Sequence, residues 1–490
     1  MWFHGNEYWL TRFIFQRGLA LIYFLAFLNA VNQYVKLCGE DGLTKLGENV
    51  GRWSFSEKPG LLQKYTSDTA VKVVSWTGLG LSFLMLLGFP YLLPQGFSTP
   101  ASMFLWAILY VLYLSLVNAG GVFYGFGWES MLLETGFFAI FLGSGATATP
   151  ILTVLLLRWV LFRNMFGAGL IKIRGDSCWR DLTCMDYHYE TQPIPNPVSW
   201  FVHHLPSRFH KFEVLGNHFV ELLIPFLYFA PQPLAAGAGI VTILFQLWLM
   251  VTGNFSWLNA LTIVLAIPTI NDSVITGLTG ISSPAVTVTP LYLSLAVLSI
   301  AILTVILSVK PVKNMVSSKQ VMNTSFNPLR IVNTYGAFGS ITKTRYEIVI
   351  EGTREETPTD DSDWKEYCFK GKPTDVSRRP RQIAPYHLRL DWQMWFAAMS
   401  PRPTRHPWFT KLMEKILEGE QDILGLLAHN PFPDEPPEKL RAVRYRYRFS
   451  SPKERRETGD WWRRERLNLY YGPKDKPQYT SSPVDYSMTE

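Results

Sequence analysis

Long apolar runs fill roughly the first 310 residues, and short polar or charged segments separate them. A hydrocarbon core about 30 Å thick needs about 20 apolar residues in a helix, so we interpret these runs as membrane spans. The pattern predicts an α-helical polytopic membrane protein with about nine spans, within a range of seven to ten. The predicted spans are 13–31, 71–93, 101–118, 129–145, 150–170, 214–232, 234–252, 257–271 and 288–309.

Three of the predicted spans have alternative interpretations. The runs at 129–145 and 150–170 are separated by few residues, which is close enough for a tight hairpin. The run at 257–271 is short enough to be a re-entrant or broken span. The run at 214–232 contains polar residues near its beginning, which leaves its start open.

Beyond about residue 310 the pattern changes to short alternating segments. Residues 345–351 and 441–449 alternate between polar and apolar positions, which is the period of a β-strand, and 467–471 is a shorter candidate. Along 441–449 the apolar and aromatic side chains line one face and the arginines line the other. These segments predict a β-rich fold for the tail.

The tail also contains a helical pattern and a polar end. Apolar residues recur at helical spacing through 408–428, and residues 472–490 are polar and predicted to be a frayed terminus. We therefore divide the chain into a membrane domain over 1–309 and a soluble β-rich α+β domain over 310–490. Polar loops at 32–70 and 171–213 interrupt the membrane domain.

Charge is distributed unevenly along the chain. Up to Ser308 there are 15 Lys and Arg against 15 Asp and Glu, and from Lys310 onward there are 31 against 24. The tail therefore carries the whole formal charge of +7, but no nucleic-acid motif accompanies it, so we predict no nucleic-acid partner. With nine spans, the loops at 32–70 and 171–213 lie on the same side as the tail. These loops hold Lys and Arg, and the positive-inside rule places that side in the cytoplasm.

The four cysteines indicate the opposite orientation. Cys38, Cys178, Cys184 and Cys368 all lie outside the predicted spans, on the side of the large loops and the tail. An even number of cysteines on one side favours disulfides in an oxidising compartment. Cys178 and Cys184 are six residues apart, so a loop disulfide is one interpretation and four free thiols are the other.

Several charged residues fall within predicted spans, where charge is costly, and Glu221 in the sixth span is one isolated example. Glu129 and Glu134 lie in the fourth span, and Arg158 and Arg163 lie in the fifth. If these spans form a hairpin, the carboxylates and guanidiniums pair inside the bundle. Such pairs either fix helix packing or line a transport path.

The densest polar segment is the His-rich stretch at 172–218. His188 and Glu190 are residue types suited to acid–base chemistry or metal binding, but no H-E-x-x-H or C-x-x-C pattern accompanies them. Three prolines between 193 and 197 favour an extended structural segment instead. The sequence also has no phosphate loop, dinucleotide fingerprint or nucleophile elbow, so we assign no catalytic residue, metal or cofactor. The alternative is a polytopic membrane enzyme or transporter that uses the intramembrane Glu and Arg residues and this stretch.

Several longer strings carry a resemblance to a known family. They are GNEYWLTR at 5–12, GWESMLLE at 127–134, CWRDLT at 178–183, YHYETQP at 187–193, NTYGAFG at 333–339, PYH at 385–387 and RLDWQMWFAA at 389–398. In these strings the chain resembles the lipase maturation factor family, polytopic proteins that help secreted lipases reach an active fold. The strings cover both the membrane part and the tail.

The resemblance implies a chaperone-like, non-catalytic role in the folding of secreted lipase clients. It also implies a lumenal tail and residence in the endoplasmic reticulum membrane of a eukaryote, or in the cell membrane of a prokaryote. The family has no established catalytic residues to carry over. The candidate partner-binding or structural residues are Trp179, Arg180, Asp181, Tyr187, His188, Tyr189, Glu190, Tyr386, His387, Arg389, Asp391 and Trp392.

Overall fold

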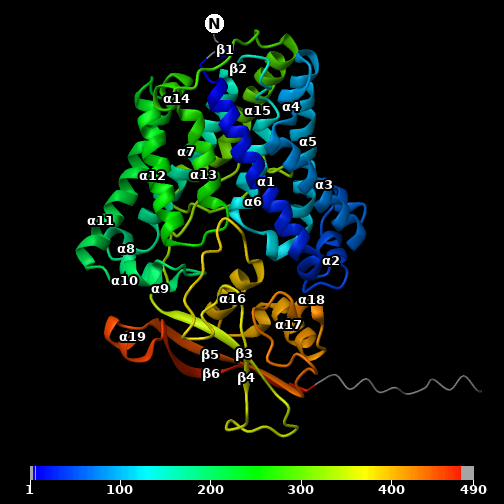
Figure 1. The fold of residues 1–490 in the computed structure, drawn as a ribbon, viewed down its shortest axis with the longest axis vertical. Coiled ribbons are helices and arrows are strands. Elements are labelled where there is room, and N and C mark those ends of the chain that lie inside the picture. The colour runs from blue at the N-terminus through cyan, green and yellow to red at the C-terminus, as the bar shows by residue number, and fades with distance from the viewer. Residues whose placement is uncertain (1–3, 6, 476–490) are drawn as a thin grey trace, which may run out of the picture.

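A helical bundle and a sheet-containing tail occupy opposite ends of the long axis of the molecule (Figure 1). The structure is a computed structural model and describes residues 4–5 and 7–475. In that part of the chain, seven helices are long and apolar enough to cross a membrane, or eight if one bent pair is counted as a span. The seven are α1 (Trp9–Cys38), α3 (Asp68–Leu87), α5 (Gln95–Ala119), α7 (Ile151–Arg174), the run Ser207–Phe229, α12 (Leu234–Thr252) and α15 (Leu291–Val316).

The protein is thus an α-helical polytopic membrane protein, with fewer complete spans than the nine predicted as the central number. The predicted span at 129–145 overlaps α6 (Gly127–Ala139), whose 13 residues reach only about 20 Å and cannot cross the hydrocarbon core alone. Every residue from Trp128 to Gly136 is buried in protein. The chain then runs through residues 140–150 to α7, which packs against α6 and is paired with it through Glu134 and Arg163. The two helices are therefore neighbours, joined by a longer connection than the tight turn considered above.

The predicted span at 257–271 is also incomplete. Here α13 (Leu258–Ala266) and η5 (Ile267–Thr269) meet α14 (Asp272–Thr279) at a bend of 104°, which agrees with the interpretation as a broken or re-entrant span. The span Ser207–Phe229 is irregular as well. It consists of α11 (Ser207–His218), the π-helical turn η3 (Phe219–Leu223) and the 3₁₀ turn η4 (Ile224–Phe229).

Both predicted polar loops contain short helices and contact the tail. Lys415 of the tail donates to Asp41 of the first loop at 2.9 Å, and Arg345 donates to the carbonyl of Gln192 in the second at 2.6 Å. These contacts place both loops on the tail side of the bundle, as predicted. The short elements of the membrane part are β1 (His4–Gly5), α2 (Leu46–Gly51), η1 (Leu61–Gln63), α4 (Phe89–Leu92), η2 (Gly121–Tyr124), β2 (Thr149–Pro150), α8 (Ser177–Arg180), α9 (Met185–Thr191) and α10 (Ser199–His203).

The tail is built on a four-stranded antiparallel sheet with the order β4-β3-β5-β6. The sequence predicted three of these strands and missed the three-residue β4. The elements of the tail are β3 (Arg345–Thr353), β4 (Lys365–Tyr367), α16 (Arg389–Met399), η6 (Pro403–Arg405), α17 (Pro407–Leu417), α18 (Gln421–Leu424), β5 (Lys439–Phe449), α19 (Pro452–Thr458) and β6 (Trp462–Asp475).

Two predictions about the tail need correction. The helix predicted over 408–428 is divided into α17 and α18, because Gly419 between them adopts a left-handed conformation at φ +72° that interrupts the helix. The terminus predicted to fray from residue 472 is strand through Asp475, because residues 472–475 continue β6 alongside β5. The rest of that prediction, 476–490, lies outside the described residues.

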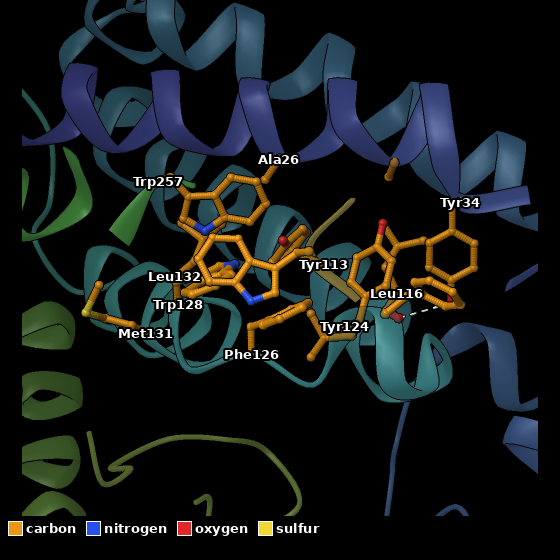
Figure 2. Packing of buried hydrophobic residues seen from close by; sticks show 14 of the residues in the cluster. Ala26, Tyr34, Tyr113, Leu116, Tyr124, Phe126, Trp128, Met131, Leu132 and Trp257 are labelled. Carbon is orange, nitrogen blue, oxygen red and sulfur yellow. Dashed lines mark hydrogen bonds between the residues drawn. The ribbon is translucent and has the colours of Figure 1, made fainter. Parts of the chain in front are cut away.

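One apolar core runs through both ends of the molecule. The same cluster of buried residues includes Trp128 of α6, Trp392 of α16 and Ile350 of β3. Figure 2 shows the part beneath α1, where Trp128 lies near Trp257. The tail is therefore packed onto the bundle, while the division at residue 309 stays a prediction.

Candidate functional site: a buried seam between bundle and tail

Several of the predicted candidates lie at the junction between bundle and tail, which we call the seam. We define it by two ion pairs, Glu129–Arg389 and Glu134–Arg163, and by the segments that hold them, 331–336 and 386–392. All four charged side chains of the pairs are at most 1% exposed. Charges so fully removed from water persist only when they are paired and hydrogen-bonded.

The first ion pair connects α16 of the tail to α6 of the bundle. Arg389 donates to the carboxylate of Glu129 at 2.7 Å and to the carbonyl of Phe123 at 2.7 Å. Its Nε donates to Asn29 of α1 at 2.7 Å, and the guanidinium carbon lies 3.6 Å from the centroid of the Tyr124 ring. Burial acts to lower the pKa of Arg389, but the Glu129 carboxylate outweighs it, and the net pKa is raised. Arg389 therefore stays charged and joins three elements of the bundle to the tail.

His387 packs beside this pair as an uncharged ring. Its side chain is 1% exposed, and the rings of Phe126, Trp128, Trp257 and Trp392 surround it with centroids 4.9 to 6.0 Å away. Burial, and then the charge of Arg389, lower the pKa of His387 well below its usual range. A neutral imidazole enclosed by aromatic rings suits packing rather than proton transfer.

The second ion pair lies within the bundle and holds a segment that follows the last span. Arg163 is hydrogen-bonded to the Glu134 carboxylate, and that carboxylate also accepts from the backbone N–H of Asn333 at 2.9 Å and from the Tyr335 hydroxyl at 2.6 Å. Arg163 donates in turn to the carbonyl of Asn333 at 2.5 Å. The sequence indicated the pair from its placement in two spans, but gave no sign that residues 333–335 insert beside it.

Arg158 of the fifth predicted span has no carboxylate partner in the described part of the chain. It donates to the carbonyls of Pro268 at 2.9 Å and Tyr228 at 3.0 Å, and to the hydroxyl of Tyr8 at 2.9 Å. Both carbonyls belong to 3₁₀ turns where a span is irregular, and such turns leave backbone groups that need partners inside a membrane. Arg158 thus supports two irregular spans, and the pairing considered for it with a carboxylate is not formed.

The loop that follows α7 is closed by a disulfide between Cys178 and Cys184, whose Cα atoms are 4.8 Å apart. Cys38 and Cys368 are free thiols. Trp179 is buried and donates to the carbonyl of Phe338 at 2.8 Å, whereas Arg180 and Asp181 are exposed. The loop therefore packs through its tryptophan and presents its two charged neighbours to solvent.

The following residues of the loop connect it to the sheet. The Tyr189 hydroxyl donates to Glu213 at 2.5 Å, and the Glu190 carboxylate accepts from the backbone N–H of Phe449 at 2.8 Å. His188 is buried, and its pKa is lowered to about 4 by burial and then by the charge of Lys172. The interpretation of His188 and Glu190 as an acid–base pair is not supported, because Glu190 is bound to the sheet.

Three residues of the tail form a buried cluster that the sequence did not indicate. Lys372 lies 3.0 Å from the Glu347 carboxylate, which also binds Arg345 at 2.5 Å. Burial lowers the pKa of Lys372 to about 8 and raises that of the nearby Asp391 to about 6. The Asp391 carboxylate accepts a hydrogen bond from the backbone N–H of Gly371 at 2.6 Å. Alternation along 345–351 predicted a strand but no partner for Glu347, and β3 is buried on both faces.

The other candidates also have structural surroundings. Trp392 is buried against Trp128, with ring centroids 5.0 Å apart, and the half-buried Tyr386 accepts from Gln33 of α1 at 3.1 Å. Tyr187 is half-buried beside Lys343 of the tail. No group of three or more His, Cys, Asp or Glu side chains suited to a metal ion occurs in the described part of the chain.

The fold and the seam define a polytopic membrane protein whose extramembrane tail is docked on the bundle through buried ion pairs. A family model described as the lipase maturation factor transmembrane domain matches residues 10–277, and one described as the lipase maturation factor C-terminal domain matches residues 331–472. The chain therefore belongs to the lipase maturation factor family. No solved structure matches it significantly.

The similar relatives extend over nearly the whole chain. Lipase maturation factor 1 of Homo sapiens is 44% identical and that of Mus musculus 43% identical, each over 96% of this chain and 88% of the relative. Lipase maturation factor 2 of Homo sapiens is 29% identical over 94% of this chain and 82% of the relative. The resemblance stated from the sequence strings is confirmed.

Proposed function

We propose that this protein is a membrane-anchored maturation factor that helps secreted lipases to fold or assemble, without catalysing a reaction of its own. The observation that carries this proposal is the similarity to lipase maturation factor 1 over 96% of the chain. The match includes both the bundle and the tail, so we extend the role named for the relatives to the whole protein.

The contacts of the seam support a non-catalytic role. Glu129, Glu134 and Arg163 are each bonded to groups from other elements of the fold. A proton-transfer or transport group needs access to a substrate or to water, and these side chains are at most 1% exposed. Their geometry suits a fixed support that sets the orientation of the tail relative to the membrane.

The accessible surfaces are where we expect a client to bind. Among the candidates, Arg180 and Asp181 are exposed on the disulfide-closed loop, next to the tail. The buried candidates, such as Trp392 and Arg389, contribute indirectly because they hold the loop, the sheet and the bundle in one arrangement.

We place the protein in the membrane of the endoplasmic reticulum, with the tail and the two large loops in the lumen. The disulfide between Cys178 and Cys184 supports this side, because disulfides persist in oxidising compartments. The basic charge of the tail does not oppose it, since the positive-inside rule weakens for long loops and folded domains.

Co-expression with a secreted lipase tests this function. A cell line lacking its own maturation factors would express the lipase with this protein, with an empty vector, or with an unrelated polytopic membrane protein. We expect higher lipase activity per mole of lipase secreted with this protein alone, and unchanged secretion of a non-lipase reporter. Equal specific activity in all three cultures, with this protein expressed and folded, would rule the proposal out.

A further inference from the structure

A cavity of about 350 Å³ lies beside the seam, between α7, α11 with its π-helical turn, α12 and α13. That volume is at the small end of the range for ligand sites, about 300–1,000 Å³. Its walls are mainly apolar and aromatic, with Met165, Val220, Phe245 and Leu258 among the lining residues. A cavity of this size and composition suits a single hydrocarbon unit, meaning one acyl chain or one sterol ring system.

The opening of the cavity has an aromatic rim. Phe209 and Phe212 of α11 and Trp248 of α12 line it, with exposed fractions of 36%, 71% and 37%. Arg208 and Lys211 occupy the same turns of α11. Exposed aromatic residues beside basic residues are typical of the membrane–water interface, so the rim lies at the level of the lipid headgroups.

The polar lining consists partly of acceptors without a donor. Lys172 donates to Glu221 Oε1 at 2.6 Å and to Asn217 at 3.1 Å, which satisfies that carboxylate oxygen. The other oxygen, Glu221 Oε2, and the amide oxygen of Gln246 have no hydrogen-bond partner among residues 4–5 and 7–475, although both residues are only 4% exposed. Unpaired buried acceptors are costly, which makes a donor from a bound molecule favourable.

The position of Glu221 depends on the irregular helix that carries it. Glu221 is the central residue of the π-helical turn Phe219–Leu223, and π-helical turns inside α-helices occur frequently at functional sites. Lys172 balances the charge of Glu221, so this ion pair adds no net charge to the polar end of the cavity.

We propose that this cavity binds one uncharged lipid with a single hydrocarbon unit and a hydroxyl-bearing head, which enters from the bilayer past Phe212 and Trp248. The hydroxyl donates to Glu221 Oε2 or to the amide oxygen of Gln246, and the hydrocarbon lies against the apolar walls. A fatty acid anion is disfavoured because its carboxylate offers no donor and would face Glu221 and Glu213.

Photolabelling of the purified full-length protein in nanodiscs tests this site. The probes are photoreactive analogues of a monoacylglycerol, a sterol and a fatty acid, and the labelled peptides are mapped by mass spectrometry. We expect the monoacylglycerol, the sterol or both to label α7, α11 or α12 at the cavity, at least several-fold more strongly than the fatty acid. Labelling by the fatty acid equal to or above the hydroxyl lipids, or no labelling at the cavity by any probe, would overturn the proposal.

Two variants separate binding from loss of fold. Gln246→Leu removes one unpaired acceptor at similar volume, and we expect about 3- to 10-fold weaker labelling, the effect of one hydrogen bond. Leu249→Trp adds bulk to a residue of the lining and should also reduce labelling. The matched control is Leu295→Trp on the exposed face of α15, which should label like the parent protein. Unchanged labelling in both cavity variants, with the thermal unfolding of the parent retained, would contradict the proposal.

Discussion

The guanidinium of Arg389 in the tail lies 2.7 Å from the carboxylate of Glu129 in the bundle, although the two residues are 260 positions apart in the sequence. Neither side chain is exposed to solvent. Breaking a buried ion pair by removing one partner costs roughly 3–5 kcal/mol, because the other charge is left uncompensated, whereas replacing both partners by apolar groups is often tolerated.

The Glu129–Arg389 pair therefore gives the first prediction. Arg389→Met should lower the free energy of unfolding by roughly 3–5 kcal/mol, and the double variant Glu129→Leu/Arg389→Met should recover much of that loss. Thermal unfolding in detergent measures both changes. Arg446→Met is the control, because Arg446 pairs with Glu465 on the surface and such pairs contribute at most about 1 kcal/mol. A double variant no more stable than Arg389→Met would argue for a role beyond charge compensation.

A second prediction concerns the segment held by Glu134. Tyr335→Phe removes the hydroxyl that donates to this carboxylate at 2.6 Å and leaves the ring in place. Hydrogen bonds to charged groups contribute about 1.5–3 kcal/mol, so we expect a loss of that size in the free energy of unfolding. Tyr65→Phe, at an exposed tyrosine of the first polar loop, should change it by less than about 0.5 kcal/mol. Equal effects of the two changes would show that the Tyr335 hydroxyl is not engaged.

The disulfide gives a third prediction. Alkylation of the denatured protein without reductant should modify only Cys38 and Cys368, and reduction should expose two further thiols. The double change Cys178→Ser/Cys184→Ser should lower the free energy of unfolding by about 2 kcal/mol, as expected for so short a loop. Four modified thiols before reduction would contradict both the disulfide and the lumenal side that we propose for it.

The pH dependence of stability gives a fourth prediction, through His188. Burial and the charge of Lys172 lower its pKa from 6.5 to about 4 in the folded protein, and the carboxylates of Glu213 and Glu221 line the same cavity. The pKa of His188 is lower in the folded than in the unfolded protein, so its contribution to the free energy of unfolding is fully present above pH 6.5 and is lost as the pH falls to 4. This contribution is roughly 3 kcal/mol.

His188→Phe keeps an aromatic ring beside Phe255 and cannot take up a proton. Unfolding measured between pH 7 and pH 4.5 should therefore depend less on pH in this variant than in the parent protein. The matched change at an exposed histidine, His429→Phe, is measured alongside it as the control for loss of a histidine. Identical pH profiles for His188→Phe and the parent would remove His188 from the acid sensitivity of the fold.

Hydropathy predicted the class of fold, and the seven or eight candidate spans fall within the predicted range of seven to ten, although below its central number of nine. The run at 129–145 is apolar because α6 is buried in protein, and burial produces the same composition whether or not a helix crosses lipid. The composition does not show where the helix ends, because α6 stops at Ala139 although residues 140–142 are still apolar. The strand β5 was predicted well because only one of its faces is buried over residues 445–449, and this produces alternation.

The seam was only partly predictable. Glu134 and Arg163 were recognisable because charge inside an apolar run is rare and must be paired. The partner of Glu129 could not be recognised from the sequence, because Arg389 lies in a tail segment whose local pattern indicates nothing about the bundle. Pairings between residues this far apart depend on tertiary packing, and neither periodicity nor spacing along one sequence records them.

The most direct test of the central claim is the activity of a secreted lipase when the seam is broken. Lipase activity per mole secreted would be compared for the parent, for Arg389→Met and for the surface control Arg446→Met, at matched amounts of membrane-inserted protein. We predict that the parent and Arg446→Met raise the specific activity equally, and that Arg389→Met loses most of the increase. Full activity with Arg389→Met, at a temperature where its tail is shown to be undocked, would contradict the claim that bundle and tail act as one unit.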